Sequence, residues 1–333
     1  MIKLIYWGTP QFAVPSLERL LHAPEIQVLG VVTQPDKRRG RGSKVSPSPV
    51  KTVAMEAGLP IWQSHNIKKD QEILTELKSQ GADAFVVVAY GQLLSPEILA
   101  MPRLGCINSH GSLLPKYRGA APIQWGLYHG ESLAGITTML MDEGMDTGDM
   151  LLIKSIEIGL LENTLDVAIR LADLSGDLLI DTLNQLDQQI LTPTPQDSDQ
   201  ATYAPLIQKS DFILDWSRSA IALHNQIRGF SPNCVTQFRE SGLKIMATAP
   251  LGEAYAAALP EELAALTPVI PPSDASPGTI VYIAPQQGPV VQTGEGLLLL
   301  RSLQMAGKRR QSGGDFANGL RLSVGEQLGE VAA

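Results

Sequence analysis

The sequence predicts an α/β protein of two domains: an N-terminal Rossmann-like parallel sheet with helices on both faces, and a smaller C-terminal OB-like β-barrel. In the first 190 residues, short apolar runs alternate with amphipathic helical patterns, which is the order of a parallel sheet with crossover helices. A polar segment with two prolines follows at residues 192–200. Beyond it, short strand-like runs separated by turn residues are typical of a small barrel.

The N-terminal elements follow from the spacing of apolar residues. Strands are expected at residues 4–7, 27–33, 85–90 and 104–107, and helices at 14–22, 50–57, 70–79 and 163–189. The run 85–90 is the most hydrophobic, so we expect it near the middle of the sheet. After the first strand, Gly8 is the one glycine of a dinucleotide fingerprint, so NAD binding is not supported.

The first domain is expected at residues 1–190, a linker at 191–209 and the second domain at 210–333. Strands of the second domain are expected at residues 235–239, 244–249, 278–283, 289–293 and 296–303. The Ala- and Pro-rich segment 254–275 reads as an extended loop between two of them.

Composition excludes several classes of protein. Cys106 and Cys234 are far apart in a chain of 333 residues, so a disulfide framework is not expected and a reducing cytoplasm fits. No Cys or His spacing fits a metal site, and we expect none. No apolar run approaches a membrane span, and the N-terminus lacks the features of a signal peptide. The formal net charge of −8 opposes nonspecific binding to nucleic acid but permits a local basic patch.

Two polar side chains end the strand at 104–107. Residues two apart in a strand face the same side, so Asn108 and His110 can point into one cleft. An Asn amide can donate to a developing oxyanion, and a His side chain can move a proton near neutral pH. The alternative is that both residues only hydrogen-bond a turn at the end of the strand.

A second polar stretch, the acidic turn at residues 141–150, follows the apolar run 135–140 and precedes another strand. It can place Asp146 beside His110, where a carboxylate would fix the imidazole tautomer and favour its charged form. The alternative is an ordinary solvated turn. Downstream of His110, Arg118 can bind a carboxylate or a phosphate, or form a surface ion pair.

A basic segment at residues 37–44 carries five cations within eight positions, broken by two glycines. Its members are Lys37, Arg38, Arg39, Arg41 and Lys44. We expect no packed element here, because the segment is highly charged and rich in glycine. It reads either as a solvated surface loop or as an arm that pairs with phosphates.

These stretches resemble the methionyl-tRNA formyltransferase family almost from end to end. The matching segments are residues 8–13, 33–36, 47–51, 86–91, 101–106, 110–115 (HGSLLP), 117–124 (YRGAAPIQ) and 146–150 (DTGDM). The resemblance implies that Asn108, His110 and Asp146 form the catalytic trio. It also implies that the segment Ser112, Leu113, Leu114 and Pro115 lies against a folate, and that the basic segment enters the acceptor arm of initiator tRNA, with Arg41 as the aligned arginine.

Tyr90 and Gly91 end their strand at the same edge, so we assign them to the folate site, with a packing role for Tyr90 as the alternative. The activity that the resemblance implies is formyl transfer from 10-formyltetrahydrofolate to the α-amino group of methionine on initiator methionyl-tRNA. We expect a cytoplasmic monomer that needs no metal and does not bind a membrane. The alternative is another folate-dependent formyltransferase, or a formyl-folate hydrolase, that acts on glycinamide ribonucleotide or an amino sugar.

Overall fold

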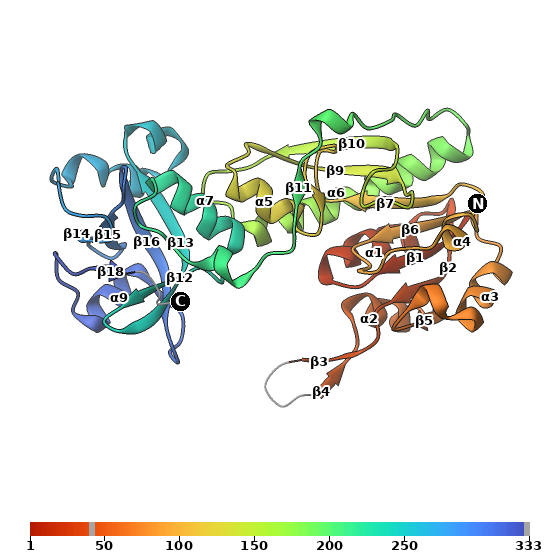
Figure 1. The fold of residues 1–333 in the computed structure, drawn as a ribbon, viewed down its shortest axis with the longest axis horizontal. Coiled ribbons are helices and arrows are strands. Elements are labelled where there is room, and N and C mark those ends of the chain that lie inside the picture. Colours follow the sequence, from red (N-terminus) through yellow and green to blue (C-terminus); the bar gives the residue numbers. More distant parts are fainter. Residues whose placement is uncertain (40–43, 330–333) are drawn as a thin grey trace. The chain divides into compact units, whose positions relative to one another are not determined.

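A computed structural model describes residues 1–39 and 44–329 (Figure 1). It divides into two compact units, and neither is a single stretch of chain. The first unit contains Met1–Pro122, Leu133–Ile156 and Ala168–Ala204, and the second contains Ile123–Ser132, Glu157–Val167 and Pro205–Ala333. Residues 191–204, which were expected to be a linker, therefore pack with the first unit.

The first unit is built on a seven-stranded sheet with the strand order β10-β9-β7-β6-β1-β2-β5. In chain order the strands are β1 (Ile2–Gly8), β2 (Ile26–Thr33), β5 (Ile61–Gln63), β6 (Ala84–Val88), β7 (Cys106–His110), β9 (Leu133–Leu140) and β10 (Met150–Glu157). The five strands from β7 to β5 run parallel, and β9 runs antiparallel to β7. The sheet predicted to be parallel is thus mixed, because the chain returns after α5 (Pro122–Tyr128) to add β9 beside β7 in the opposite direction.

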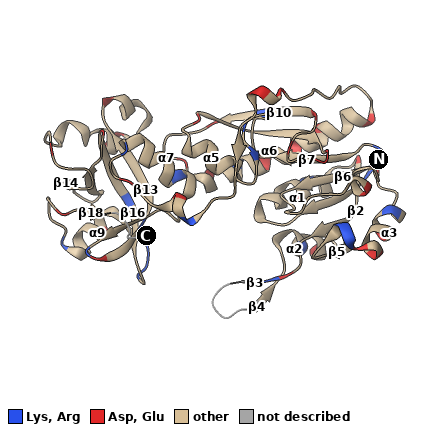
Figure 2. Ribbon diagram, in the orientation of Figure 1, with Lys and Arg blue, Asp and Glu red and all other residues tan. Residues whose placement is uncertain are grey.

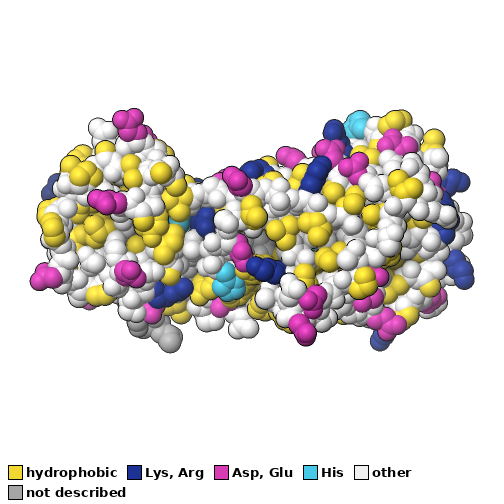
Figure 3. All heavy atoms as spheres, turned by 90° about the horizontal axis from the view of Figure 1, so that it is seen from above, with side chains coloured by type: hydrophobic (Ala, Val, Ile, Leu, Met, Phe, Trp, Pro, Cys, Tyr) yellow, Lys and Arg dark blue, Asp and Glu magenta, His cyan; other side chains and the backbone are white. Residues whose placement is uncertain are grey.

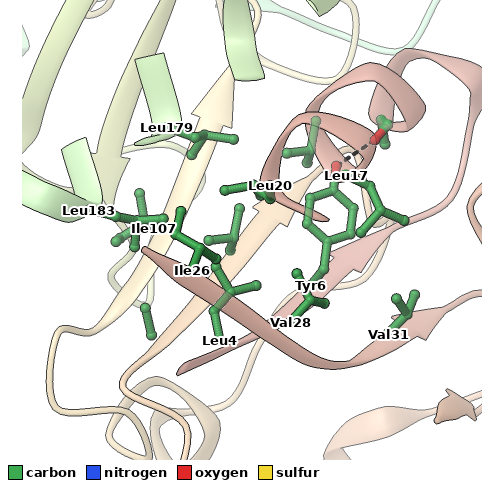
Figure 4. Close-up of a cluster of buried hydrophobic side chains, with 14 of the residues drawn as sticks. Leu4, Tyr6, Leu17, Leu20, Ile26, Val28, Val31, Ile107, Leu179 and Leu183 are labelled. Carbon is green, nitrogen blue, oxygen red and sulfur yellow. Dashed lines mark hydrogen bonds between the residues drawn. The ribbon is translucent and has the colours of Figure 1, made fainter. Parts of the chain in front are cut away.

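Helices cover both faces of this sheet. They are α1 (Val14–His22), α2 (Pro49–Glu56), α3 (Gln71–Ser79), α4 (Pro96–Leu99) and α6 (Thr164–Asp187). One core cluster joins Leu17 of α1 and Leu179 of α6 to Leu4 of β1 (Figure 4). Leu74 of α3 lies in a second cluster with Ile5, the next residue of β1. Successive residues of β1 therefore face opposite layers, as the period of a strand requires.

Four short strands form two small sheets in the first unit. In one, β3 (Lys37–Arg39) pairs with β4 (Lys44–Ser46), and in the other β8 (Arg118–Gly119) pairs with β11 (Tyr203–Ala204). The 3-10 helices of the chain are Gln11–Ala13, Ile67–Lys69, Ser198–Gln200, Lys209–Phe212, Glu253–Ala258 and Thr267–Val269.

The second unit is a curled antiparallel sheet with helices packed on it. Its strand order is β14-β15-β16-β13-β12-β18, with β17 beside β16. The strands are β12 (Val235–Phe238), β13 (Ser241–Leu251), β14 (Ile280–Ala284), β15 (Gly288–Gln292), β16 (Leu297–Met305), β17 (Gln311–Ser312) and β18 (Leu328–Gly329). The helices are α5 (Pro122–Tyr128), α7 (Ala220–Phe230), α8 (Glu261–Ala264) and α9 (Gly313–Leu320).

The Ala- and Pro-rich segment 254–275 is not the extended loop that we expected. Leu259, Leu263 and Ile270 are buried in a cluster with Leu251 and Leu299. The segment therefore packs on the sheet of the second unit, because its leucines and isoleucine supply an apolar face.

Helix α7 carries a buried polar group, His224, inside the second unit. The side chain is 1% exposed. Its Nε2 lies 2.7 Å from the carbonyl oxygen of Leu160 and its Nδ1 lies 2.8 Å from Oγ1 of Thr248. A carbonyl only accepts, so Nε2 donates and Nδ1 accepts from the hydroxyl, which makes a neutral imidazole fully bonded. Burial first, with contributions from Arg228 and Arg301, lowers the pKa of His224 from 6.5 to about 4.

This lowered pKa predicts a specific loss of stability in acid. The unfolded chain binds a proton at His224 below about pH 6.5, whereas the folded chain resists it down to about pH 4. The stabilisation is therefore complete above pH 6.5 and is lost as the pH falls toward 4. Between pH 7.5 and pH 5 this group should lower the free energy of unfolding by about 2 kcal/mol. Urea unfolding at both pH values, on the wild type and on His224→Gln, measures the effect. An equal pH dependence in the two proteins would contradict it.

Candidate active site

The carboxyl ends of the parallel strands meet at one edge of the first sheet, where ligand sites lie in sheets of this kind. The carbonyl oxygen of Tyr90, just beyond β6, accepts from Oγ1 of Thr9 at 2.9 Å and from Nε2 of Gln34 at 3.3 Å. Thr9 follows β1 and Gln34 follows β2. These bonds join the ends of three neighbouring strands.

Strand β7 brings Asn108 and His110 to this edge. It lies between β6 and β9, so its position is fixed from both sides. Between the two residues, Ser109 lies 2.7 Å from the hydroxyl of Ser175 on α6, which places its side chain on the helix layer. Asn108 and His110 both contact Asp146, so they share the other face, as the spacing predicted.

Asp146 is the point at which the polar groups converge. Its Oδ1 accepts from Nδ2 of Asn108 at 3.3 Å, and its Oδ2 accepts from the backbone N–H of Gly119 at 2.9 Å. The same Oδ2 lies 3.6 Å from Nδ1 of His110. One carboxylate therefore contacts both side chains of β7 and the backbone of β8.

His110 is surrounded by acceptors. The residue is 6% exposed. Its Nε2 lies 2.9 Å from the carbonyl oxygen of Tyr117, while Nδ1 faces the carboxylate of Asp146. An imidazolium can donate to both of these oxygens, and a neutral ring to one of them. The ring is thus held in one orientation between two oxygens.

The turn that carries Asp146 has a demanding backbone. Asp146 has φ +56°, in the left-handed region where Asp and Asn are tolerated better than other residues. At Gly148 a Cβ would lie 1.8 Å from the carbonyl oxygen of Leu140. A side chain at that position would force the turn away from β9, so glycine is required there.

The segment 112–115 is fixed to β9 by one hydroxyl. Oγ1 of Thr137 donates to the carbonyl oxygen of Ser112 at 2.7 Å and accepts from the backbone N–H of Leu114 at 3.1 Å. Leu114 is buried and Leu113 is half-buried, and a Cβ on Gly135 would lie 2.2 Å from Cδ2 of Leu113. Thr137 has no motif of its own, so sequence reasoning missed it.

Tyr90 and Gly91 differ in what they present at the edge. The Tyr90 ring is buried in the core, 5.2 Å from the ring of Trp7 in an edge-on contact, and burial raises the pKa of its hydroxyl. The ring of Tyr90 therefore packs in the core, which is the alternative role considered from the sequence. Gly91 is exposed with φ +92°. At these two positions the main chain, rather than the tyrosine ring, faces the edge.

Arg118 does not form the surface ion pair that was one interpretation of it. It is 3% exposed, and its Nε donates to Oε1 of Gln196 at 2.9 Å. It is therefore an interior residue and not a surface ion pair. The expectation failed because Gln196, 78 residues away in sequence, lies in a segment that reads as a polar linker.

The basic segment departs from the loop that we expected, because its two arms pair as β3 and β4. The hairpin stands away from the large sheet in Figure 1. Lys37 is exposed, and Arg41 lies outside the described residues. At the base of the hairpin, Nζ of Lys51 lies 2.7 Å from Asp36, and this ammonium holds the pKa of the Asp36 carboxyl below its usual value.

Charge is otherwise dispersed. Lys and Arg, and Asp and Glu, are scattered along the ribbon of both units (Figure 2), and the face in Figure 3 mixes the two signs. Within the described residues, no group of three or more His, Cys, Asp or Glu could hold a metal ion.

Comparison with known proteins shows the family. The Formyl transferase family matches residues 2–183, and the Formyl transferase C-terminal domain matches residues 206–321. Methionyl-tRNA formyltransferase of Cyanothece sp. is 60% identical over 332 residues, covering 98% of this chain and 99% of the relative. That of Trichormus variabilis is 61% identical over 331 residues, with the same two coverages. The chain belongs to the methionyl-tRNA formyltransferase family.

A solved structure extends the likeness of fold. WlaRD, a sugar 3N-formyl transferase crystallised in the presence of dTDP and 5-N-formyl-THF, matches with a TM-score of 0.62 at 17% identity. The match covers 93% of this formyltransferase and 99% of that chain. Among the described residues, no helix of this formyltransferase is long and apolar enough to cross a membrane.

Proposed function

We propose that this chain transfers the formyl group of 10-formyltetrahydrofolate to the α-amino group of methionine on initiator methionyl-tRNA, for translation initiation. The observation that carries the proposal is the convergence of Asn108, His110 and Asp146 at the carboxyl edge of the sheet. In this reaction the amine nitrogen bonds to the formyl carbon, the bond from that carbon to the folate nitrogen breaks, and a proton passes from the amine to the leaving nitrogen.

Asn108 stabilises the charge that forms on the formyl oxygen. Its Nδ2 carries two hydrogens, and one of them is directed to Asp146 at 3.3 Å. The second can donate to the oxygen as it becomes an oxyanion. A donor that is already fixed by the carboxylate need not reorganise during the reaction.

His110 moves the proton. The attacking amine must lose a proton, and the leaving nitrogen must gain one. An imidazole can accept the first and supply the second, directly or through water. Asp146 and the carbonyl oxygen of Tyr117 hold the ring in place for both steps. No covalent enzyme intermediate is required.

Two further sites complete the proposal. The folate lies along Ser112, Leu113, Leu114 and Pro115 and the main chain at Tyr90 and Gly91, where Thr137 fixes the segment. The initiator tRNA pairs its phosphates with the basic segment and with the second unit, which we propose to be an OB-like barrel. Basic residues near its end are Arg301, Lys308, Arg309, Arg310 and Arg321. We propose that the enzyme acts as a monomer in the cytoplasm.

A direct assay separates this function from its alternative. The protein is incubated with 10-formyltetrahydrofolate and charged initiator tRNA, and in parallel with free methionine, glycinamide ribonucleotide or an amino sugar. We expect formyl transfer to the charged tRNA alone. Transfer to a small acceptor, or hydrolysis of the formyl-folate without transfer, would favour another folate-dependent activity. Relatives at 60% and 61% identity along nearly the whole chain favour the tRNA substrate.

The first prediction concerns the proton relay. Asp146→Asn should lower kcat by about a hundredfold or more, because the imidazole loses its charged partner. Asn tolerates the left-handed backbone at this position, so the turn should survive. Glu143→Gln, which removes an exposed carboxylate from the same turn, is the matched control and should keep full activity. Equal rates for the two variants would remove the proposed role of Asp146.

The oxyanion role gives a second prediction. Asn108→Ala should lower kcat roughly a hundredfold with little change in KM for either substrate, because the donor acts in the transition state. Steady-state kinetics at saturating charged tRNA measures this. A large rise in KM at unchanged kcat would mean that Asn108 only binds substrate.

The folate site gives a third prediction. Leu113→Ala should raise KM for formyl-folate about tenfold and leave KM for charged tRNA unchanged, since it removes apolar contact area from one ligand. Leu114 is a poor choice because it is buried, and its replacement would test folding. Leu133→Ala, at an exposed leucine of β9, is the control. A parallel rise in both KM values would indicate general damage.

The basic segment gives a fourth prediction. Changing Lys37, Arg38 and Arg39 together to Ala should weaken tRNA binding and reduce the slope of log K against log salt by about 2, with folate binding unchanged. Arg41→Ala should weaken the use of charged tRNA in the same way. The control removes three exposed lysines elsewhere on the first unit, at Lys68, Lys69 and Lys78. If the two triple variants kept the same salt slope, the segment would be only a solvated surface element.

A further inference from the structure

We propose that Gln196 is a positioning residue for formyl transfer, which holds the Asp146 turn in the conformation that directs its carboxylate to His110 and Asn108. This inference rests on the function proposed above. Gln196 lies in the segment after α6, which reads as a polar linker in sequence. Both amide hydrogens are used: Nε2 donates to the carbonyl oxygen of Asp146 at 2.9 Å and to that of Gly148 at 2.7 Å.

The segment around Gln196 is fixed to the first unit on both sides. Before it, Thr194 exchanges two backbone hydrogen bonds of 2.8 Å with Met150, the first residue of β10. After it, the carbonyl oxygen of Thr202 accepts from the backbone N–H of Arg118 at 2.8 Å, and Ala204 pairs with Gly119. The segment therefore runs from the start of β10 to β8 with Gln196 between its two attachments.

Arg118 fixes which way the amide of Gln196 points. Its Nε is a donor, so the atom of Gln196 that it meets at 2.9 Å must be the oxygen. The nitrogen is then the atom that faces the turn. Nη2 of Arg118 is buried and has no hydrogen-bond partner among the described residues. Burial removes the Arg118 guanidinium from water, so losing its hydrogen bond to Gln196 would leave a second buried N–H without a partner.

Arg118 and its neighbour act on Asp146 by two routes. Through Gln196, Arg118 holds the backbone of the turn. Next to it, the N–H of Gly119 donates to Oδ2 of the Asp146 carboxylate at 2.9 Å. Gly119 has φ +115°, and a Cβ there would lie 2.8 Å from the carbonyl oxygen of Ala204. The close approach of the segment thus requires glycine at the residue that binds the carboxylate.

The geometry of the trio makes it sensitive to this support. Asp146 has a left-handed backbone that a non-glycine residue adopts at a cost, and the turn keeps it only if its neighbours hold it. The contacts of its carboxylate with Asn108 and His110, at 3.3 and 3.6 Å, leave little room for displacement. A shift of about 1 Å at a reacting group can cost a hundredfold in rate. Gln196 should therefore act on kcat through Asp146, without touching the substrate.

The test compares three variants of the full chain. Gln196→Leu removes the donors and the acceptor, and Gln196→Glu keeps an acceptor for Arg118 and removes the donors. Gln200→Leu is the matched control, since the Gln200 side chain is exposed and donates to Asp197. We expect both Gln196 variants to lower kcat about 10- to 100-fold with KM for formyl-folate within twofold of wild type, and Gln200→Leu to behave as wild type. Hydrogen exchange of the peptide 141–150 should be faster in the Gln196 variants.

A double-mutant cycle separates positioning from general damage. If Gln196 acts through Asp146, Gln196→Leu should change kcat by less than about threefold in an Asp146→Asn background. The same fractional loss in both backgrounds, or wild-type kcat and exchange in both Gln196 variants, would overturn the inference. Asn108→Ala, measured alongside, separates the two proposals. If Asn108→Ala lowers kcat while the Gln196 variants keep wild-type kcat, the positioning role of Gln196 is overturned and the proposed function stands. If the wild type transfers no formyl group, both the proposed function and the role of Gln196 are overturned.

Discussion

The carboxylate of Asp146 is the contact on which the candidate site depends. It reaches two side chains of β7 and one backbone N–H of β8, and so joins three groups from two separate strands. A single anion can satisfy a neutral amide, an imidazole and a peptide donor because it presents several lone pairs in one plane. The left-handed backbone of the same residue is the strained part of this arrangement. Rigid elements surround the turn: β9 before it, β10 after it and the paired strands β8 and β11 beside it.

The fold explains why such a turn can exist there. A sheet whose central strands are covered on both faces leaves its carboxyl edge as the place where polar groups can meet a ligand. The antiparallel addition of β9 and β10 changes this plan in one respect. Because β9 runs antiparallel to β7, it ends opposite Ile107, and the connection to β10, rather than a strand-to-helix loop, brings Asp146 to Asn108 and His110. The acidic residue therefore comes from a connection whose length and glycines are set by β9 and β10 themselves.

Much of this was predictable from local patterns. A strand at this position, the shared face of Asn108 and His110, and the acidic turn between two strands all follow from period-two spacing and turn residues. The bounds of the strand were wrong: it was expected at residues 104–107, and β7 spans Cys106–His110, so both polar residues lie within it. Thr137 and Gln196 were not predictable, because each acts through partners far away in sequence and neither belongs to a motif. A surface ion pair was one of two interpretations of Arg118, because charge normally lies at the surface. The hairpin at the basic segment was missed because its pairing depends on backbone bonds, which composition does not reveal.

The interleaved course of the chain has a consequence for dissecting the molecule genetically. The polypeptide passes between the two units five times, at 122/123, 132/133, 156/157, 167/168 and 204/205. No single truncation can release either unit intact, since a fragment ending at residue 190 keeps pieces of both and loses the segment that contains Gln196. Deletions in that segment, which reads as a tolerant spacer, would instead alter the proposed catalytic turn. Complementation by separately expressed halves would have to restore several chain crossings at once.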